Sequence, residues 1–209
     1  MLSDTTIKRL SALGEISKQG KRVNGLFRLM ENPFLWEQAY ANIYSNKGAM
    51  TKGVDKTTMD GFSDERAAGI VKLLKEDRYR FSPSRRVYIP KANGKMRPLG
   101  IPTADDKLVQ EVVRIILEQI YEAVFKDSSH GFRPSRSCHT ALRCIQHSWT
   151  GMKWIIDMDI QGFFDNIDHE VMIGLLEKRI DDKRFIGLIK AMMRAGYVDD
   201  WKYHSTYSG

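Results

Sequence analysis

With 209 residues, 42% of them apolar, the chain is long enough for one large domain or two small ones around a hydrophobic core. Its two cysteines exclude a disulfide framework, and no apolar run approaches the roughly 20 residues of a membrane-spanning helix. Thirty-three Lys and Arg against 26 Asp and Glu give a net charge of +7, which favours a polyanionic partner but equally suits a solvated basic surface.

The N-terminal part of the chain is predicted to be a basic helical arm. Residues 7–30 carry apolar side chains at helical spacing, and Gly14, Gly20 and Gly25 are expected to break the arm into short pieces. The cations of the arm lie between its apolar positions: Lys8, Arg9, Lys18, Lys21, Arg22 and Arg28.

Two capped helices and a basic loop are predicted next. Asn32 caps a helix that starts at Pro33 and runs to about Asn46, because proline is favoured in a first helical turn. Residues 47–53 form a basic, glycine-containing loop. Ser63 then caps a further helix. This helix has acidic residues in its first turn, where the helix dipole stabilises negative charge.

A β-hairpin and a long helix are predicted in the middle of the chain. Residues 85–89 read as a strand, Asn93-Gly94 as the hairpin turn, and residues 95–99 as the returning strand. Thr103 caps the long helix that follows, whose apolar residues recur with a period of 3.6 and predict one buried face.

The remaining segments are predicted to be mostly helical. We expect helices over 135–147 and 182–195, and a helix capped by Asp168 between them. The apolar run 153–159 predicts a buried strand. A helix-rich chain with few short strands indicates an α+β fold. The helix after Asp168 is expected to direct three side chains inward: Val171, Leu175 and Leu176.

Four carboxylates lie in or just after the predicted strand 153–159. Asp157 and Asp159 share one face of it, and Asp159, at its end, is the better metal ligand because backbone there gives way to a cleft. Asp157 is expected to be a structural carboxylate. Asp165 either serves the site or anchors the turn, and Asp168 is better explained as a helix cap.

Aromatic and cationic side chains accompany these carboxylates. Phe164 either packs into the core or forms a wall under a nucleotide sugar, where its ring would exclude a 2′-hydroxyl, while Phe163 faces the core. Lys91, Lys95 and Arg97 surround the hairpin turn, and an arginine fork with an ammonium suits a triphosphate. The alternative is that these residues are ordinary surface cations at an exposed hairpin tip.

Four segments resemble, in the same order, blocks of the reverse transcriptases encoded by group II introns. They match the loop of the N-terminal extension, the first fingers block, the second block and the third block: residues 51–55, 78–110, 130–139 and 159–169. The resemblance extends over roughly residues 45–209. It implies the fingers of a right-hand polymerase with part of the palm, including a β-hairpin and short antiparallel strands.

The resemblance also implies three parts of the chain and their limits. Residues 1–48 are expected to form a basic helical N-terminal extension, residues 49–125 the fingers, and residues 126–209 the start of the palm with inserted helices.

The resemblance implies roles for individual residues. Asp159 would bind both catalytic Mg²⁺ ions, or Mn²⁺ in their place, with the Ile160 carbonyl as a further ligand. Lys91 and Arg97 would contact the triphosphate of the dNTP substrate, and Phe164 would select its sugar.

Implied partners are the group II intron RNA, an RNA template and a DNA primer, with a homodimer also possible. Gln161 stands where the family has a lysine. The residues expected to bind nucleic acid are Lys18, Lys21, Arg22, Lys47, Lys52, Arg85, Arg86 and Arg133.

The sequence Tyr197-Val198-Asp199-Asp200 has the form of the second catalytic motif of this family, but we expect it to be a coincidence. It follows a predicted helix directly, without an apolar strand before or after it. Its spacing of 40 residues from Asp159 is too short for the family. The chain ends where a Pro-Gln-Gly segment is expected, so the chain alone is predicted to lack the second carboxylate block and not to polymerise DNA.

Three functional hypotheses follow. The first is an RNA-directed DNA polymerase (a nucleotidyltransferase) of a group II intron that also binds its intron RNA to assist splicing and mobility. The second is a non-catalytic RNA-binding splicing cofactor, in which the arm and the loop at 47–53 carry the binding. The third is an unrelated soluble α+β domain. With no signal peptide, we expect a cytoplasmic location in a bacterium or an organelle, without a membrane.

Overall fold

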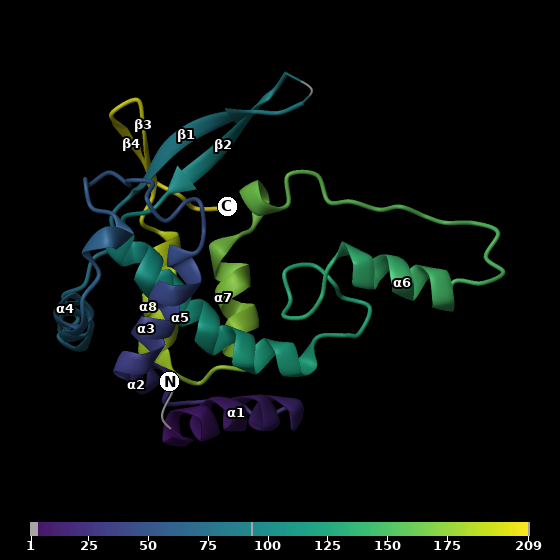
Figure 1. Cartoon of the computed structure of the whole chain (residues 1–209), viewed down its shortest axis with the longest axis horizontal. Helices are drawn as coiled ribbons and strands as arrows, with labels where there is room; N and C mark the ends of the chain where they lie inside the picture. Colours follow the sequence, from purple (N-terminus) through teal and green to yellow (C-terminus); the bar gives the residue numbers. More distant parts are fainter. Residues whose placement is uncertain (1–3, 93, 209) are drawn as a thin grey trace.

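The computed structural model describes residues 4–92 and 94–208, and it has a helical body with a small sheet on one side (Figure 1). Helix α5 runs through the body, and α1 and α3 pack against it. The body also contains α2, α4, α7 and α8. The helices of the body are α1 (Asp4–Lys18), α2 (Leu26–Leu29), α3 (Pro33–Tyr44), α4 (Asp64–Lys75), α5 (Ala104–Tyr121), α7 (His169–Glu177) and α8 (Lys183–Met193).

Helix α5 supplies the centre of the hydrophobic core. Its side chains at Leu108, Val112, Ile116 and Ile120 are fully buried, as their spacing predicts. Burial of each such side chain contributes about 1.5–3 kcal/mol to folding. The core continues from Leu10 of α1 to the buried residues of α8, so it crosses all three predicted parts of the chain. The limits of those parts stay a prediction.

The predicted helix caps are confirmed, whereas the helix predicted over 135–147 begins at Cys138, with Ser137 as its cap. Asn32 accepts a hydrogen bond from the backbone N–H of Phe34, and Ser63 accepts one from Arg66. Asp168 likewise caps α7. The prediction that Gly14 breaks the arm is wrong, because α1 continues through it.

Four strands form one mixed sheet in the order β2-β1-β3-β4. The predicted hairpin is confirmed, with Val87 opposite Leu99, although Asn93 of its turn lies outside the described residues. Strand β3 pairs with β1 in parallel, so the expectation of antiparallel strands holds only in part. The strands are β1 (Ser84–Pro90), β2 (Met96–Ile101), β3 (Tyr197–Asp199) and β4 (Lys202–His204).

A buried carboxylate joins the sheet to the helical body. Asp106, in the first turn of α5, is 2% exposed. It accepts hydrogen bonds from the Thr103 hydroxyl at 2.7 Å, the Tyr79 hydroxyl at 2.8 Å and the Ser82 backbone N–H at 3.1 Å. Burial raises the pKa of Asp106, and the three donors partly oppose that rise. Asp106 therefore fixes the segment that enters β1.

A second carboxylate joins the two ends of the chain. Asp182 is buried and accepts hydrogen bonds from the backbone N–H groups of Phe27 at 2.9 Å and Phe185 at 3.0 Å. An isolated parallel bridge between Val23 and Ile180 lies beside it. The N-terminal helices are thus held directly against α8.

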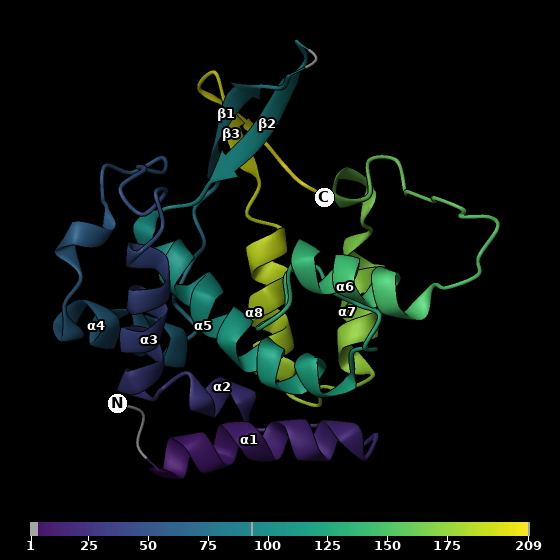
Figure 2. The same cartoon turned by 45° about the vertical axis from the view of Figure 1, so that its right-hand side comes forward.

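The prediction of a buried strand over 153–159 is wrong. This segment has no regular structure, and Trp154 and Ile156 are 88% and 81% exposed. A strand needs a neighbour for its backbone N–H and C=O groups, and no described segment pairs with this one. Figures 1 and 2 show it as a long excursion after α6 (Cys138–Ser148).

Helix α7 also differs from its prediction. Val171 and Leu175, expected to face inward, are exposed, whereas Leu176 is buried as predicted. Ile173 is the further apolar residue that α7 buries. The apolar positions of α7 occupy more than one face, so spacing alone did not identify the buried one.

We predict that Asp106→Ala lowers the free energy of unfolding by about 3 kcal/mol, because it leaves three donors without their acceptor. Urea denaturation measures this change. Asp60→Ala is the matched control, since that carboxylate is exposed and bonded to no other side chain in the described chain. A loss below 1 kcal/mol for Asp106→Ala would contradict the joining role of Asp106.

Candidate nucleic-acid interface

The basic loop after α3 is held in place by two cations that sequence reasoning did not connect with it. Lys107 donates from Nζ to the carbonyl oxygens of Thr51 at 2.7 Å and Gly48 at 3.2 Å. Arg85 donates from Nη2 to the Lys52 carbonyl at 2.7 Å and from Nε to the Gly53 carbonyl at 3.2 Å. Partial burial lowers the pKa of Lys107. These contacts turn the carbonyls of the loop inward.

Gly53 allows the loop to lie against the start of α5. A Cβ atom at this position would be 2.8 Å from the Pro102 carbonyl oxygen and from the Thr103 backbone. Only a residue without a side chain fits such a close approach. The backbone of the loop is therefore fixed at one end by shape and along its length by hydrogen bonds.

The side chains of Lys47 and Lys52 lie on the outside of this loop. Both residues are exposed, and neither has an ion pair within the part of the chain that the structure describes. Because Arg85 belongs to β1 and binds the loop, the loop adjoins the base of the β1–β2 hairpin. A loop with a fixed backbone and exposed ammonium groups is suited to contact the phosphates of a nucleic acid.

The predicted triphosphate cations lie at the outer part of the hairpin. Arg97 is opposite Ile89 in the ladder, and Lys91 follows Ile89 by two residues. Both cations are exposed, and the hairpin extends away from the helices (Figures 1 and 2). The structure thus brings Lys91 and Arg97 to one end of the same element, as the predicted pairing requires.

Besides Arg85, two further predicted nucleic-acid contacts are engaged inside the protein. Arg133 bonds to both carboxylate oxygens of Glu122 at 2.7–3.1 Å and to the Lys126 and Ser129 carbonyls, and its side chain is 6% exposed. Its guanidinium organises the turn after α5, so a template contact would require its release. Arg86 lies over the Tyr197 ring at 3.8 Å and packs β1 against β3.

The basic arm packs against the body and is only partly available. Lys18 pairs with Glu15 at 2.9 Å, and Arg22 pairs with Asp181 at 2.9 Å. Lys21 is exposed and has no ion pair among the described residues. The pairs of Lys18 and Arg22 are solvent-exposed, and such pairs are weak enough for a phosphate to compete with them.

The predicted polymerase residues do not form a metal site in this conformation. Asp159 and Ile160 are exposed on the irregular segment, and no group of three or more His, Cys, Asp or Glu side chains in residues 4–92 and 94–208 could share a metal ion. Phe164 is 72% exposed in a short 3₁₀ turn. The prediction that Phe163 faces the core is wrong, because its side chain is exposed and lies against Phe164 with ring centres 5.4 Å apart. The residues present thus do not fit a Mg²⁺ site.

The segment Tyr197–Asp199 is itself a strand, which the sequence did not predict; α8 precedes it and the polar strand β4 follows it, so no apolar strand flanks it, as predicted. The Tyr88 hydroxyl donates to the Asp199 carboxylate, which ties Asp199 to β1. In the sheet β3 lies beside β1 and β4 lies beyond β3, and Figure 1 shows both away from the excursion after α6. Asp199 is therefore held within the sheet, and the coincidental nature of this sequence match stays a prediction.

A family model described as reverse transcriptase (RNA-dependent DNA polymerase) matches residues 89–208, more than half of the chain. The chain therefore belongs to the reverse transcriptase family. Within that family it is similar to proteins encoded by group II introns.

Three relatives illustrate this similarity. The group II intron-encoded protein LtrA of Lactococcus lactis is 54% identical over 185 residues, which are 88% of this chain and 31% of the relative. A 91 kDa protein in the cob intron of Schizosaccharomyces pombe is 43% identical, over 93% of this chain and 25% of its own length. A protein of Arabidopsis thaliana named nuclear intron maturase 1, mitochondrial, is 37% identical, over 44% of this chain and 13% of its own length. The chain thus spans about a third or less of these proteins.

No helix within the described ranges combines the length and the apolar character that crossing a bilayer requires.

We predict that Gly53→Ala destabilises the protein by about 1–3 kcal/mol, because the new methyl group meets backbone atoms that cannot move cheaply. Gly48→Ala, in the same loop, is the matched control, since nothing lies within 4 Å of a Cβ built there. Urea denaturation compares the two variants. Equal stabilities would show that the loop is not seated against α5.

The Glu122–Arg133 pair should make stability depend on pH. Hydrogen bonding to Arg133 lowers the pKa of Glu122 below its ordinary 4.5, so its contribution is present above that value and is lost as the pH falls through the lowered pKa. We predict that Glu122→Gln is less stable than the parent at pH 7, with a difference that shrinks at pH 3. Glu177→Gln, at an exposed unpaired position of the described chain, should show no difference at either pH. A pH-independent difference for Glu122→Gln would refute this account.

Proposed function

We propose that this chain supplies the fingers and the first part of the palm of an RNA-directed DNA polymerase encoded by a group II intron, and that it binds RNA. The observation that carries the proposal is the clamped basic loop beside a cationic hairpin in a member of the reverse transcriptase family. The similarity to proteins named as group II intron-encoded and as an intron maturase supports an intron RNA as the partner.

The RNA contact is proposed to rest mainly on the loop and the hairpin. Lys47 and Lys52 would neutralise successive phosphates, because their backbone is already ordered and costs little entropy on binding. Lys91 and Arg97 would hold the triphosphate of an incoming dNTP. An arginine fork binds phosphate oxygens in two places, and a lysine adds a point charge.

The catalytic part of the site is proposed to require a rearrangement of the segment around Asp159. Members of the reverse transcriptase family generally use divalent metal ions. Asp159 with the Ile160 carbonyl would bind Mg²⁺, or Mn²⁺ in its place, once residues 153–159 pair with a neighbouring strand and become rigid. Phe164 would then lie under the sugar. The exposed, irregular state of this segment is the reason to propose that the chain alone does not polymerise.

A non-catalytic RNA-binding role in splicing is the second candidate. The exposed lysines and the basic arm favour it, because they need no metal site to bind RNA. The two candidates share the RNA contact and differ in chemistry. Primer extension on an RNA template with Mg²⁺ or Mn²⁺ distinguishes them for this chain: we expect RNA binding without nucleotide addition, and any templated addition would overturn the proposed inactivity.

We predict that Lys47→Ala/Lys52→Ala weakens the binding of structured intron RNA and lowers the slope of log K against log salt by about 0.7–0.9 per lost phosphate contact. Fluorescence anisotropy across a salt series measures both quantities. Lys72→Ala/Lys178→Ala removes the same charge from exposed positions of α4 and the end of α7, and it should change the slope by less than half as much. Equal effects of the two double variants would mean that net charge, and not the loop, determines binding.

The same titration with an unrelated RNA of equal length tests specificity. A preference for intron RNA that persists at higher salt would support recognition of the intron. Equal binding that disappears with salt would limit this chain to generic electrostatic contact.

A further inference from the structure

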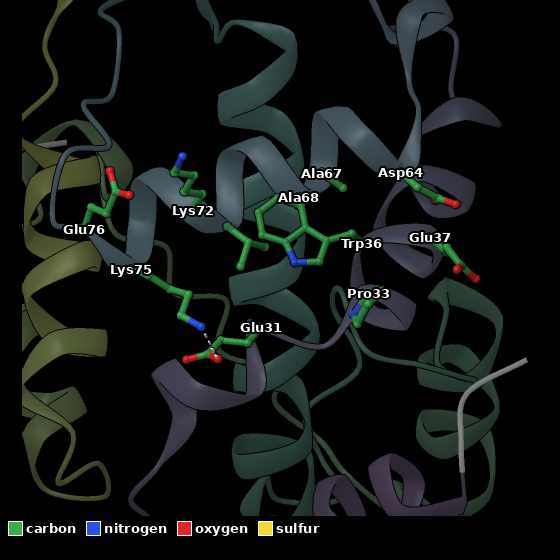
Figure 3. Close-up of a pocket in the computed structure, with 11 residues that line it drawn as sticks. Glu31, Pro33, Trp36, Glu37, Asp64, Ala67, Ala68, Lys72, Lys75 and Glu76 are labelled. Carbon is green, nitrogen blue, oxygen red and sulfur yellow. Dashed lines mark hydrogen bonds and ion pairs between the residues drawn. The ribbon is translucent and has the colours of Figure 1, made fainter.

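A pocket of about 690 Å³ opens between α3 and α4, on a part of the molecule that the RNA contact does not use (Figure 3). Its volume lies within the range of sites that bind ligands or anchor side chains. Its residues on α3 belong to the first half of that helix, whereas the basic loop follows the other end. A 12-residue helix is roughly 18 Å long, so an occupant of the pocket could leave the loop accessible.

The floor and one wall of the pocket are apolar. Trp36 lies beneath the floor, fully buried, and its indole N–H donates to the Met30 carbonyl at 2.7 Å, so no unpaired polar group of this residue faces the pocket. Ala67, Ala68 and Val71 form the wall on α4. Because alanine side chains are small, they leave space above the buried Trp36, and a large apolar side chain would fill it against Ala68 and Val71.

The rim of the pocket is acidic, although the chain as a whole is basic. Four carboxylates and two ammonium groups surround the opening, in a chain with a net charge of +7. Two of the carboxylates are paired, since Glu31 binds Lys75 at 3.0 Å and Glu76 binds Arg78 at 3.0 Å. The charged lining residues are Glu31, Glu37, Asp64, Lys72, Lys75 and Glu76.

The unpaired acids lie together at one end of the pocket. Figure 3 shows Glu37 and Asp64 on the side away from Lys72 and Lys75. Neither acid has an ion pair within the described parts of the chain. An RNA phosphate would be repelled at this end, whereas a cation beside an apolar group would be attracted.

We propose that this pocket docks a basic helical segment of a partner protein, which inserts one large apolar side chain over Trp36 and places a Lys or Arg against Glu37 and Asp64. A groove between two helices, with an apolar floor and a charged rim, is the usual receptor for an amphipathic helix. Charge complementarity selects the partner, because a basic segment is repelled by the chain as a whole and attracted only where acids gather. The intron-encoded protein would then bind RNA and a basic protein on separate surfaces.

The test uses two defined probes. One is an 18-residue amidated helical peptide of alanine and lysine with leucine along one face, and the other has glutamate in place of lysine. The protein carries ¹³C-labelled alanine methyl groups, and NMR follows them during titration. Ala67 and Ala68 report on the pocket, and Ala41, exposed on α3 outside the lining, is the internal control.

We expect the lysine peptide to shift the Ala67 and Ala68 signals saturably and to leave Ala41 unchanged. The glutamate peptide should bind at least tenfold more weakly. Equal binding of both peptides, shifts confined to other alanines, or saturation of Ala67 and Ala68 by single-stranded RNA would each overturn the proposal.

Variants test the two parts of the pocket separately. Ala68→Trp should fill the cavity and weaken the lysine peptide at least tenfold, whereas Ala41→Trp should change its affinity less than twofold. Glu37→Gln/Asp64→Asn should weaken it at least fivefold, and Asp60→Asn/Glu65→Gln removes the same charge outside the pocket as a control. If the control variants weaken binding as much as the pocket variants, the peptide is bound elsewhere and the proposal fails.

Discussion

The buried Asp106 carboxylate accepts three hydrogen bonds, and the rest of the structure depends on this constraint. It fixes the first turn of α5 to the segment that enters β1, and α5 is the helix around which the core forms. Arg85 of β1 and Lys107 of α5 then reach the same loop. The position of the basic surface is therefore a consequence of one buried charge whose desolvation is offset by its donors.

Local signals made most of the helical body predictable. The caps at Asn32, Ser63, Thr103 and Asp168 act within three residues, and the hairpin depends on a short turn, so the sequence alone identifies them. The strand predicted over 153–159 failed for the opposite reason. Its composition favours a strand, but a strand exists only with a partner, and composition does not report whether one is present.

The exposure of several candidate cations was predictable from the sequence, but the contacts that organise the site were not. Lys47, Lys52, Lys91 and Arg97 are exposed cations, as their positions in a loop and a hairpin predicted. Arg133 has the same side chain as Arg97, but its guanidinium is paired with Glu122. The difference lies in contacts 11 residues apart along the chain, which no local pattern distinguishes. Lys107 was missed because a single lysine on an amphipathic helix looks like ordinary surface.

Lys107 and Arg85 bind the basic loop through its backbone carbonyl oxygens, which every amino acid possesses. The course of the loop depends on its side chains at two positions: Gly53, where a Cβ would meet backbone atoms, and Ala49, which is 3% exposed and belongs to the core. The exposed positions of the loop, among them Lys47, Met50 and Lys52, can change chemistry while the backbone keeps its path. Substitution at these exposed positions can adapt the loop to a different RNA without refolding the protein, so grafting them alone from a relative would exchange RNA preference while stability stays constant.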